Sequence, residues 1–160
     1  MSEDAAIAGV ELLRPPTFAD ERGMVYRMVR ATDPHFRGFG EIYFSTAYPA
    51  AVKAWKRHHR LTATYACLAG RIRMVLFDPR MDSPTSGRVS ELTMGPDEYR
   101  LLVVPPGIWN GFQGPGVPLS VVANCASEPH DPAEFDRAPP SSPEIPYRWP
   151  SPIGEAVPHE

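Results

Sequence analysis

The chain has 160 residues, of which 42% are hydrophobic and 22% are charged, as is typical of a single globular domain. Its formal net charge of -3, with no basic stripe, argues against a nucleic-acid-binding protein. No run of about 18 apolar residues is present, so we expect no membrane partner. No secretory signal is present and the two cysteines lie far apart, so we expect a cytoplasmic protein with reduced thiols.

Short runs of apolar and β-branched residues, each bounded by Gly, Pro, Asp or Ser, predict a series of β-strands. In chain order they cover residues 7–13, 24–30, 41–46, 52–55, 62–68, 71–77, 88–93, 100–104 and 120–125. Apolar and polar residues alternate most clearly over 71–76, and the Ala69-Gly70 step before this run is typical of a hairpin turn. Strands at a spacing of about 8–12 residues predict an all-β fold, and a double-stranded β-helix, or jelly roll, is the expected form.

Proline is unusually frequent, at 20 of 160 residues. Because proline ends helices, only one short helix is predicted, near residues 132–137. Many prolines follow residue 128, which predicts an extended tail over 128–160 that lies on the barrel. We therefore expect one domain, residues 1–160, with a core over about residues 8–127.

A cation-rich segment at residues 53–60 reads KAWKRHHR and holds six ionisable side chains in eight positions. Alternate residues of a strand share a face, which places Lys56, His58 and Arg60 together. Such a row can face a barrel interior only where an anion or polar ligand meets it, because an unpaired buried charge is costly. The other interpretation is an exposed basic edge strand.

Lys56 has several candidate roles. Nearby like charges and burial would favour its neutral amine, which could act as a base toward a C–H bond beside a ketone or as a Schiff-base amine. It could instead be a permanent cation that holds a phosphate or enolate oxygen, or an exposed salt-bridge partner. His58 is either an acid–base group or a hydrogen-bonded structural histidine, and Tyr43, on the preceding strand, is a candidate acid.

Two further segments carry candidate binding residues. The run VVPPGIWNGF is a strand that enters a Pro-Pro-Gly turn, after which Asn110 is placed to point into the barrel mouth. Trp109 beside it either packs in the barrel or contacts a ligand. Arg22, in the turn DERG, has a planar fork suited to phosphate or carboxylate, although a surface arginine is the more common outcome.

Together these segments resemble a cupin and, among the cupins, the dTDP-4-dehydrorhamnose 3,5-epimerase family. The resemblance covers about residues 8–150 and rests on FADERG, EIYFS then AVKAW, GRIRMVLFDPRMDSPTSG, VPPGIWNGF and the ending IPYRWP. It implies a homodimer of jelly rolls that epimerises a nucleotide-linked 4-keto-6-deoxy sugar without a metal or other cofactor. In that reaction a base removes a proton beside the ketone from one face, and an acid returns one to the other.

By this resemblance Arg22 matches an arginine that contacts the nucleotide diphosphate, and Lys53 stands where the family has another arginine. Lys56 falls at the position of the catalytic histidine, and Asn110 at a histidine of the Pro-Pro-Gly segment. The aspartate that orients the catalytic histidine and the acidic tyrosine also lack counterparts, so the family's catalytic residues are replaced here. A slip of two places in the register would make His58 the base.

The leading hypothesis is a metal-independent epimerase or isomerase that transfers protons beside a ketone, on a nucleotide-linked 4-keto-6-deoxy sugar or a related natural-product intermediate. The alternative is a catalytically altered cupin that only binds a small anionic or nucleotide-sugar ligand. A metal-dependent enzyme is third, because the metal-ligand positions of a cupin read lysine, alanine and asparagine beside one histidine, His58. The predicted catalytic residues are Lys56, His58 and Tyr43, and the predicted substrate-binding residues are Arg22, Lys53, Arg60, Trp109 and Asn110.

Overall fold

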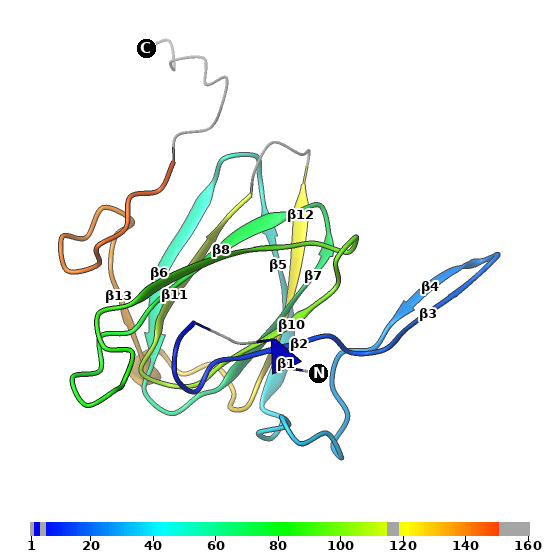
Figure 1. Ribbon diagram of the computed structural model, residues 1–160, viewed down its shortest axis with the longest axis horizontal. Coiled ribbons are helices and arrows are strands. Elements are labelled where there is room, and N and C mark those ends of the chain that lie inside the picture. The colour runs from blue at the N-terminus through cyan, green and yellow to red at the C-terminus, as the bar shows by residue number, and fades with distance from the viewer. Residues whose placement is uncertain (1, 4–5, 115–118, 151–160) are drawn as a thin grey trace, which may run out of the picture.

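The computed structural model describes residues 2–3, 6–114 and 119–150, which form two facing antiparallel sheets and a separate hairpin (Figure 1). The first sheet has the order β1 (Ser2–Glu3), β2 (Glu11–Leu13), β10 (Leu101–Val104), β7 (Ala63–Ala69), β12 (Ser120–Ala126) and β5 (Glu41–Ala47). The second has the order β13 (Phe135–Arg137), β6 (Val52–His58), β11 (Trp109–Gln113), β8 (Ile72–Phe77) and β9 (Val89–Met94). The hairpin pairs β3 (Thr17–Asp20) with β4 (Gly23–Tyr26). The predicted jelly roll is confirmed.

The main core lies between the two sheets and follows from alternation along the strands. On β8, Ile72, Met74 and Leu76 are each at most 1% exposed and belong to this core. Burying one such side chain contributes about 1.5–3 kcal/mol. Val75, which points the other way, is also fully buried, so β8 is covered on both faces.

Residues 138–149 of the predicted proline-rich tail pack on the outer face of the second sheet, whereas residues 151–160 of that prediction lie outside the described residues. Ile145 of the tail joins Trp55 and Trp109 in a second apolar cluster. The rings of Tyr147 and Trp149 lie 6.1 and 5.1 Å from the ring of Trp55. This packing explains why the apolar residues on that face of the sheet are not exposed.

Several predicted elements differ from the observed ones. The Ala69-Gly70 hairpin is wrong, because β7 and β8 belong to different sheets and Gly70, with φ of +69°, turns the chain from one sheet to the other. The predicted short helix is a single 3-10 turn, η1 (Pro132–Glu134), followed by β13. β11 was not expected, since WNGFQ has few β-branched residues, but hydrogen bonding to β6 and β8 on either side makes it a strand. Among the described residues, no helix is long and apolar enough to cross a membrane.

Candidate active site

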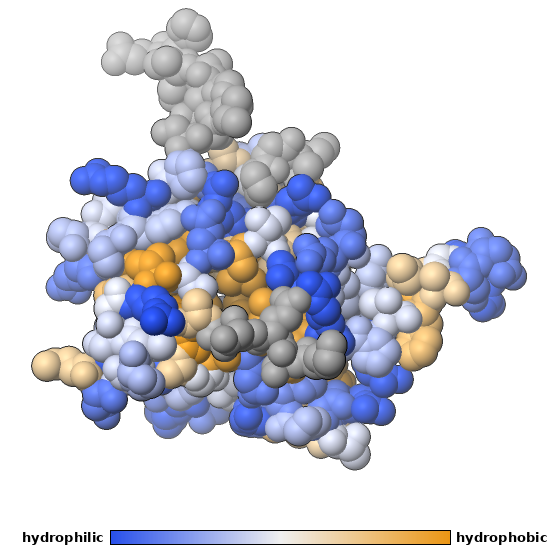
Figure 2. All heavy atoms as spheres, in the orientation of Figure 1, coloured by the Kyte–Doolittle hydropathy of each residue, from blue (hydrophilic) through white to orange (hydrophobic). Residues whose placement is uncertain are grey.

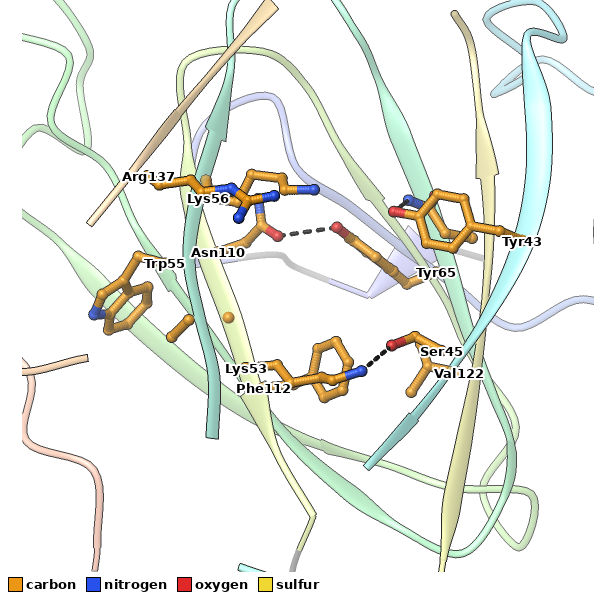
Figure 3. A pocket seen from close by; sticks show the side chains of 13 residues that line it. Tyr43, Ser45, Lys53, Trp55, Lys56, Tyr65, Asn110, Phe112, Val122 and Arg137 are labelled. Atoms are coloured by element: carbon orange, nitrogen blue, oxygen red, sulfur yellow. Dashed lines mark hydrogen bonds between the residues drawn. The ribbon is translucent and has the colours of Figure 1, made fainter. Parts of the chain in front are cut away.

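A cavity of about 380 Å³ opens between the two sheets, with walls from β5, β7 and β12 on one side and β6, β11 and β13 on the other (Figure 3). Its polar lining residues are Tyr43, Ser45, Lys53, Lys56, Tyr65, Asn110, Asn124 and Arg137. Three of these are cations, and no aspartate or glutamate lines the cavity among the described residues. Such a cavity can bind an anion or stabilise a negative charge that develops during a reaction.

A β-bulge explains how two lysines of one strand reach the same cavity. Lys53 and Lys56 are an odd number of residues apart, so strict alternation would put them on opposite faces. On β11, however, Asn110 pairs with Lys56 and Phe112 with Lys53, so β6 has one extra residue between the two pairs. The extra residue brings both lysines to the cavity.

Lys56 is half-buried on the cavity wall. Its Nζ lies 4.4 Å from the centre of the Phe135 ring, and it has no hydrogen bond or ion pair with the described residues. Burial, and behind it the charge of Arg137, lowers the pKa of Lys56, while Glu134 and Glu41 act in the opposite direction. The neutral amine is therefore more accessible here than for a lysine in water.

Tyr43 faces Lys56 from the opposite wall, on β5 (Figure 3). Its hydroxyl oxygen accepts a hydrogen bond from Asn124 Nδ2 at 2.8 Å and donates none to the described residues. Burial raises the pKa of Tyr43, although the bond from Asn124 opposes this. The phenol therefore keeps its proton and has it free to donate.

The other polar groups of the cavity hold one another in place. Tyr65 Oη donates to Asn110 Oδ1 at 3.0 Å, and Asn110 Nδ2 donates to the carbonyl oxygen of Lys56 at 3.1 Å. Lys53 Nζ donates to Ser45 Oγ at 2.7 Å (Figure 3). These bonds tie β6 and β11 to the opposite sheet, which fixes the distance between the two walls.

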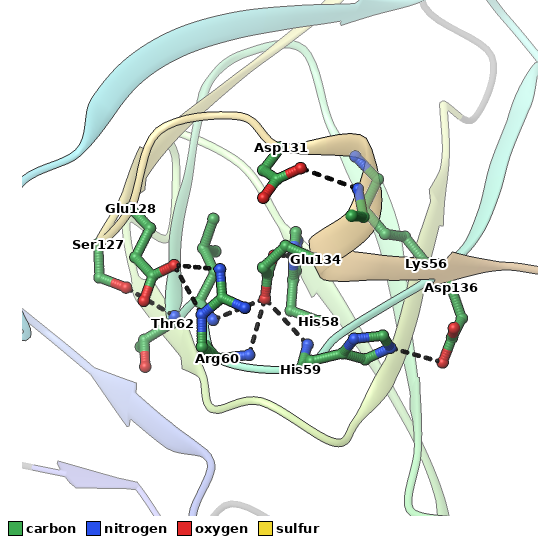
Figure 4. A network of polar contacts seen from close by, with 12 residues as sticks. Lys56, His58, His59, Arg60, Thr62, Ser127, Glu128, Asp131, Glu134 and Asp136 are labelled. Carbon is green, nitrogen blue, oxygen red and sulfur yellow. Dashed lines mark hydrogen bonds and ion pairs between the residues drawn. The ribbon is translucent and has the colours of Figure 1, made fainter.

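His58 shares the inward side of β6 but does not line this cavity, because the tail covers it (Figure 4). Its Nδ1 lies 2.8 Å from Glu134 Oε2, and its Nε2 is buried without a partner among the described residues. Burial lowers the pKa of His58, despite the opposing effect of Glu134. His58 is thus a buried, hydrogen-bonded side chain outside the cavity.

Glu134, in η1, is 1% exposed and fastens the tail to the end of β6 (Figure 4). Its Oε1 accepts from the backbone N–H groups of His59, Arg60 and Leu61 at 2.7–2.9 Å. Burial alone would raise the pKa of Glu134, but these bonds and His58 outweigh it and lower the pKa to about 2. The carboxylate is therefore ionised at neutral pH and holds the tail in place.

We expect the free energy of unfolding to fall as the pH is lowered from neutrality. Below 6.5, the ordinary pKa of histidine, the unfolded chain binds a proton at His58 that the folded chain does not, so acid favours unfolding. Glu134 adds the same effect as the pH falls from 4.5 to about 2. Urea unfolding at a series of pH values would measure this, and His58→Gln should remove the part that begins near pH 6.5. A variant that kept the full dependence would contradict this assignment.

Three other predicted site residues also lie away from the cavity. Arg60 follows the end of β6 and pairs with Glu128, since the strand stops before it can continue the alternation. Trp109 packs in the apolar cluster under the tail, with Arg57 over its ring at 4.7 Å. Arg22 is 83% exposed at the hairpin tip and pairs with Asp20. Of the predicted residues, the cavity therefore brings together Tyr43, Lys53, Lys56 and Asn110.

Sequence reasoning missed Arg137, Asn124 and the placement of Tyr65. Arg137 reaches the cavity because β13 pairs with β6. The two segments are about 80 residues apart, and no local sequence pattern predicts that they pair. Asn124 and Val122 alternate along β12, so the inward face of that strand could have been identified had its register been known. Asn124 Oδ1 is buried without a partner among the described residues, which leaves it free to accept a hydrogen bond from a ligand.

The chain is similar to one protein family and to several known proteins. A family model described as dTDP-4-dehydrorhamnose 3,5-epimerase matches residues 4–157. The crystal structure of a dTDP sugar isomerase from Desulfovibrio desulfuricans G20 is similar, with 46% identity, a TM-score of 0.87, and coverage of 90% of this chain and 92% of that one. The spore coat polysaccharide biosynthesis protein SpsL of Bacillus subtilis is 30% identical over 146 residues, 89% of this chain and 96% of that protein. The probable low-salt glycan biosynthesis epimerase Agl13 of Haloferax volcanii is 31% identical over 115 residues, 71% and 74% of the two chains.

Proposed function

The chain belongs to the dTDP-4-dehydrorhamnose 3,5-epimerase family, and from this premise we propose that it epimerises or isomerises a nucleotide-linked 4-keto-6-deoxy sugar by proton transfer beside the ketone. The observation that carries the proposal is the position of Lys56 and Tyr43 on facing walls of one cavity (Figure 3). A sugar ring between them would present one face to an amine and the other to a phenol. Inversion at carbon needs such a pair.

In the proposed reaction the neutral amine of Lys56 removes the proton from a carbon next to the ketone. The electron pair of the C–H bond moves toward the carbonyl, so an enolate oxygen forms, and the cations of the cavity stabilise its charge. Tyr43 then donates its phenolic proton to the opposite face of the same carbon. One proton leaves and one arrives, so the sugar is inverted at that carbon and otherwise unchanged. Lys56 then releases its extra proton to water and Tyr43 takes one back from water, which restores both groups.

The proposal assigns no metal to this reaction. Among the described residues, no group of three or more His, Cys, Asp or Glu side chains is placed to share a metal ion. His58, at one of the positions where a cupin would hold a metal, has its Nδ1 engaged by Glu134. Proton transfer by side chains needs no such site, because the ketone itself acidifies the neighbouring C–H bonds.

The test is solvent exchange. The protein is incubated in D₂O with a dTDP-linked 4-keto-6-deoxyhexose, and deuterium at C3 and C5 is followed by NMR, beside a known epimerase as a positive control. Enzyme-dependent incorporation at either carbon is the expected result. If the control exchanges and this protein only binds the sugar, as shown by calorimetry, the protein is a binding module and the proposed catalysis is wrong.

We further propose that the protein works as a homodimer, because apolar side chains gather on the shaft of the projecting hairpin (Figure 2). Phe18, Met24 and Val25 are about half exposed or more, and within the described part of the chain β3 and β4 pair only with each other. The edge strand β5 adds Phe44, which is 62% exposed. A second copy would cover these surfaces. Arg22, on the same hairpin, would then contact a substrate only in the partner's cavity.

Val25→Asp is expected to convert the dimer to a monomer, because it places a charge in the apolar contact without touching the barrel core. Light scattering coupled to size-exclusion chromatography measures the mass directly. Met81→Asp is the matched control, since Met81 is 95% exposed on a loop away from these surfaces. A wild-type protein of monomeric mass would refute the dimer.

A further inference from the structure

The chain uses lysine sparingly. Among its 16 basic residues only Lys53 and Lys56 are lysines, and both line the cavity. Elsewhere the chain supplies positive charge with arginine, whose guanidinium does not lose its proton in proteins. An ammonium group can lose its proton, and this cavity holds both of the chain's side-chain amines.

Arg137 lies directly across the sheet from Lys56. β13 pairs antiparallel with β6, and Arg137 is the Cα partner of Lys56. Side chains at such paired positions have Cβ atoms about 4.5–5.5 Å apart on the same face, and like charges there are destabilising. The sheet thus holds two cations together at the cavity wall (Figure 3).

Neither cation of this pair is neutralised. Arg57 and Arg60 on the same segment pair with Asp136 and Glu128. Lys56 and Arg137, by contrast, have no ion pair or hydrogen bond through their side chains among the described residues, and both lie over the ring of Phe135, at 4.4 and 5.1 Å from its centre. The repulsion between these two cations costs stability. Local arrangements that cost stability are expected at functional sites.

We propose that Arg137 is a positioning residue for Lys56. Its permanent charge across the β6–β13 ladder disfavours a second cation on the same wall, which favours the form of the Lys56 amine that can accept a proton. This inference rests on the proposed function. The groups around Lys56 are consistent with it: Glu134 is engaged by His58 and three backbone N–H groups, and Tyr43 and Tyr65 have raised pKa values and stay uncharged. Glu41 at the start of β5 opposes Arg137, as does Glu134, but burial and Arg137 prevail in lowering the pKa of Lys56.

The direct test follows the two amines without using activity. Reductive methylation with ¹³C-formaldehyde labels Lys53, Lys56 and the N-terminus, and Lys53→Arg assigns the signals. In Arg137→Gln the Lys56 signal should titrate at higher pH than in the wild type, while Arg137→Lys should restore the wild-type value. Asp136→Asn, one residue away on β13, is the matched control and should leave the titration unchanged.

The kinetic test uses the pH profile of the sugar reaction. The acid limb of kcat should move to higher pH in Arg137→Gln, with a severalfold loss of kcat at pH 7, and return in Arg137→Lys. If the Lys56 titration does not move in folded Arg137→Gln, the inference is wrong. If it moves but no 4-keto sugar exchanges deuterium even in the wild type, the proposed function fails while the effect of Arg137 on Lys56 stands.

Discussion

Lys56→Gln is expected to lower kcat by about 100- to 10,000-fold, the range that removal of a general acid or base typically costs. The amide has no basic nitrogen, so it cannot take the proton beside the ketone, although it keeps a polar side chain in the cavity. KM should change much less, because Lys53 and Arg137 still supply positive charge to the wall. Deuterium exchange and steady-state kinetics on the same dTDP-sugar would measure both quantities.

Lys56→Arg separates the role of base from that of charge. It retains the cation but cannot readily lose a proton, so a base at this position predicts that it is as inactive as Lys56→Gln. Activity that survived in Lys56→Arg would show that Lys56 only stabilises negative charge. Arg57→Gln is the matched control, because it removes a cation from the other face of β6 and should leave kcat near the wild-type value.

Glu134→Ala is expected to destabilise the protein by about 3–5 kcal/mol, the usual cost of removing one partner from a buried ion pair or hydrogen-bonded charge. The substitution leaves His58 and the backbone N–H groups of His59, Arg60 and Leu61 without their acceptor in a buried place. Chemical denaturation at pH 7 measures this loss.

Glu134→Gln serves as the graded comparison for this prediction. Its amide oxygen can still accept from the backbone groups, so its loss of stability should be clearly smaller than that of Glu134→Ala. The exposed Glu144 provides a neutral reference, and Glu144→Ala should change the free energy of unfolding little. Equal stability of Glu134→Ala and wild type would mean that the carboxylate does not hold the tail.

The positions of most strands could be predicted from sequence, because buried apolar residues alternate and turn residues bound each run. Which strands pair could not: Gly70 signals a turn, but nothing local tells a hairpin from a crossing between sheets. The same limit hid β13, whose three residues FDR are a strand only because β6 lies beside them. The predictions failed where a segment depends on a distant partner.

The candidate site shows the same difference between residues in recognisable local segments and residues that depend on a distant segment. Lys56, Lys53, Asn110 and Tyr43 could be found because their segments carry unusual residues or resemble a known family, whose fold puts them together. His58 was expected beside Lys56 in an open cavity, but the buried carboxylate that covers it lies 76 residues further along the chain.

The confinement of both side-chain amines to one hollow has a practical consequence for handling the protein. Reagents that target primary amines, such as the activated esters of sensor chips and fluorescent dyes, find no lysine elsewhere on this chain. Apart from the N-terminus, amine coupling would therefore modify the lysines of the cavity proposed to bind the ligand. Immobilised or labelled samples would then show no ligand binding. Oriented capture through another chemistry avoids that loss.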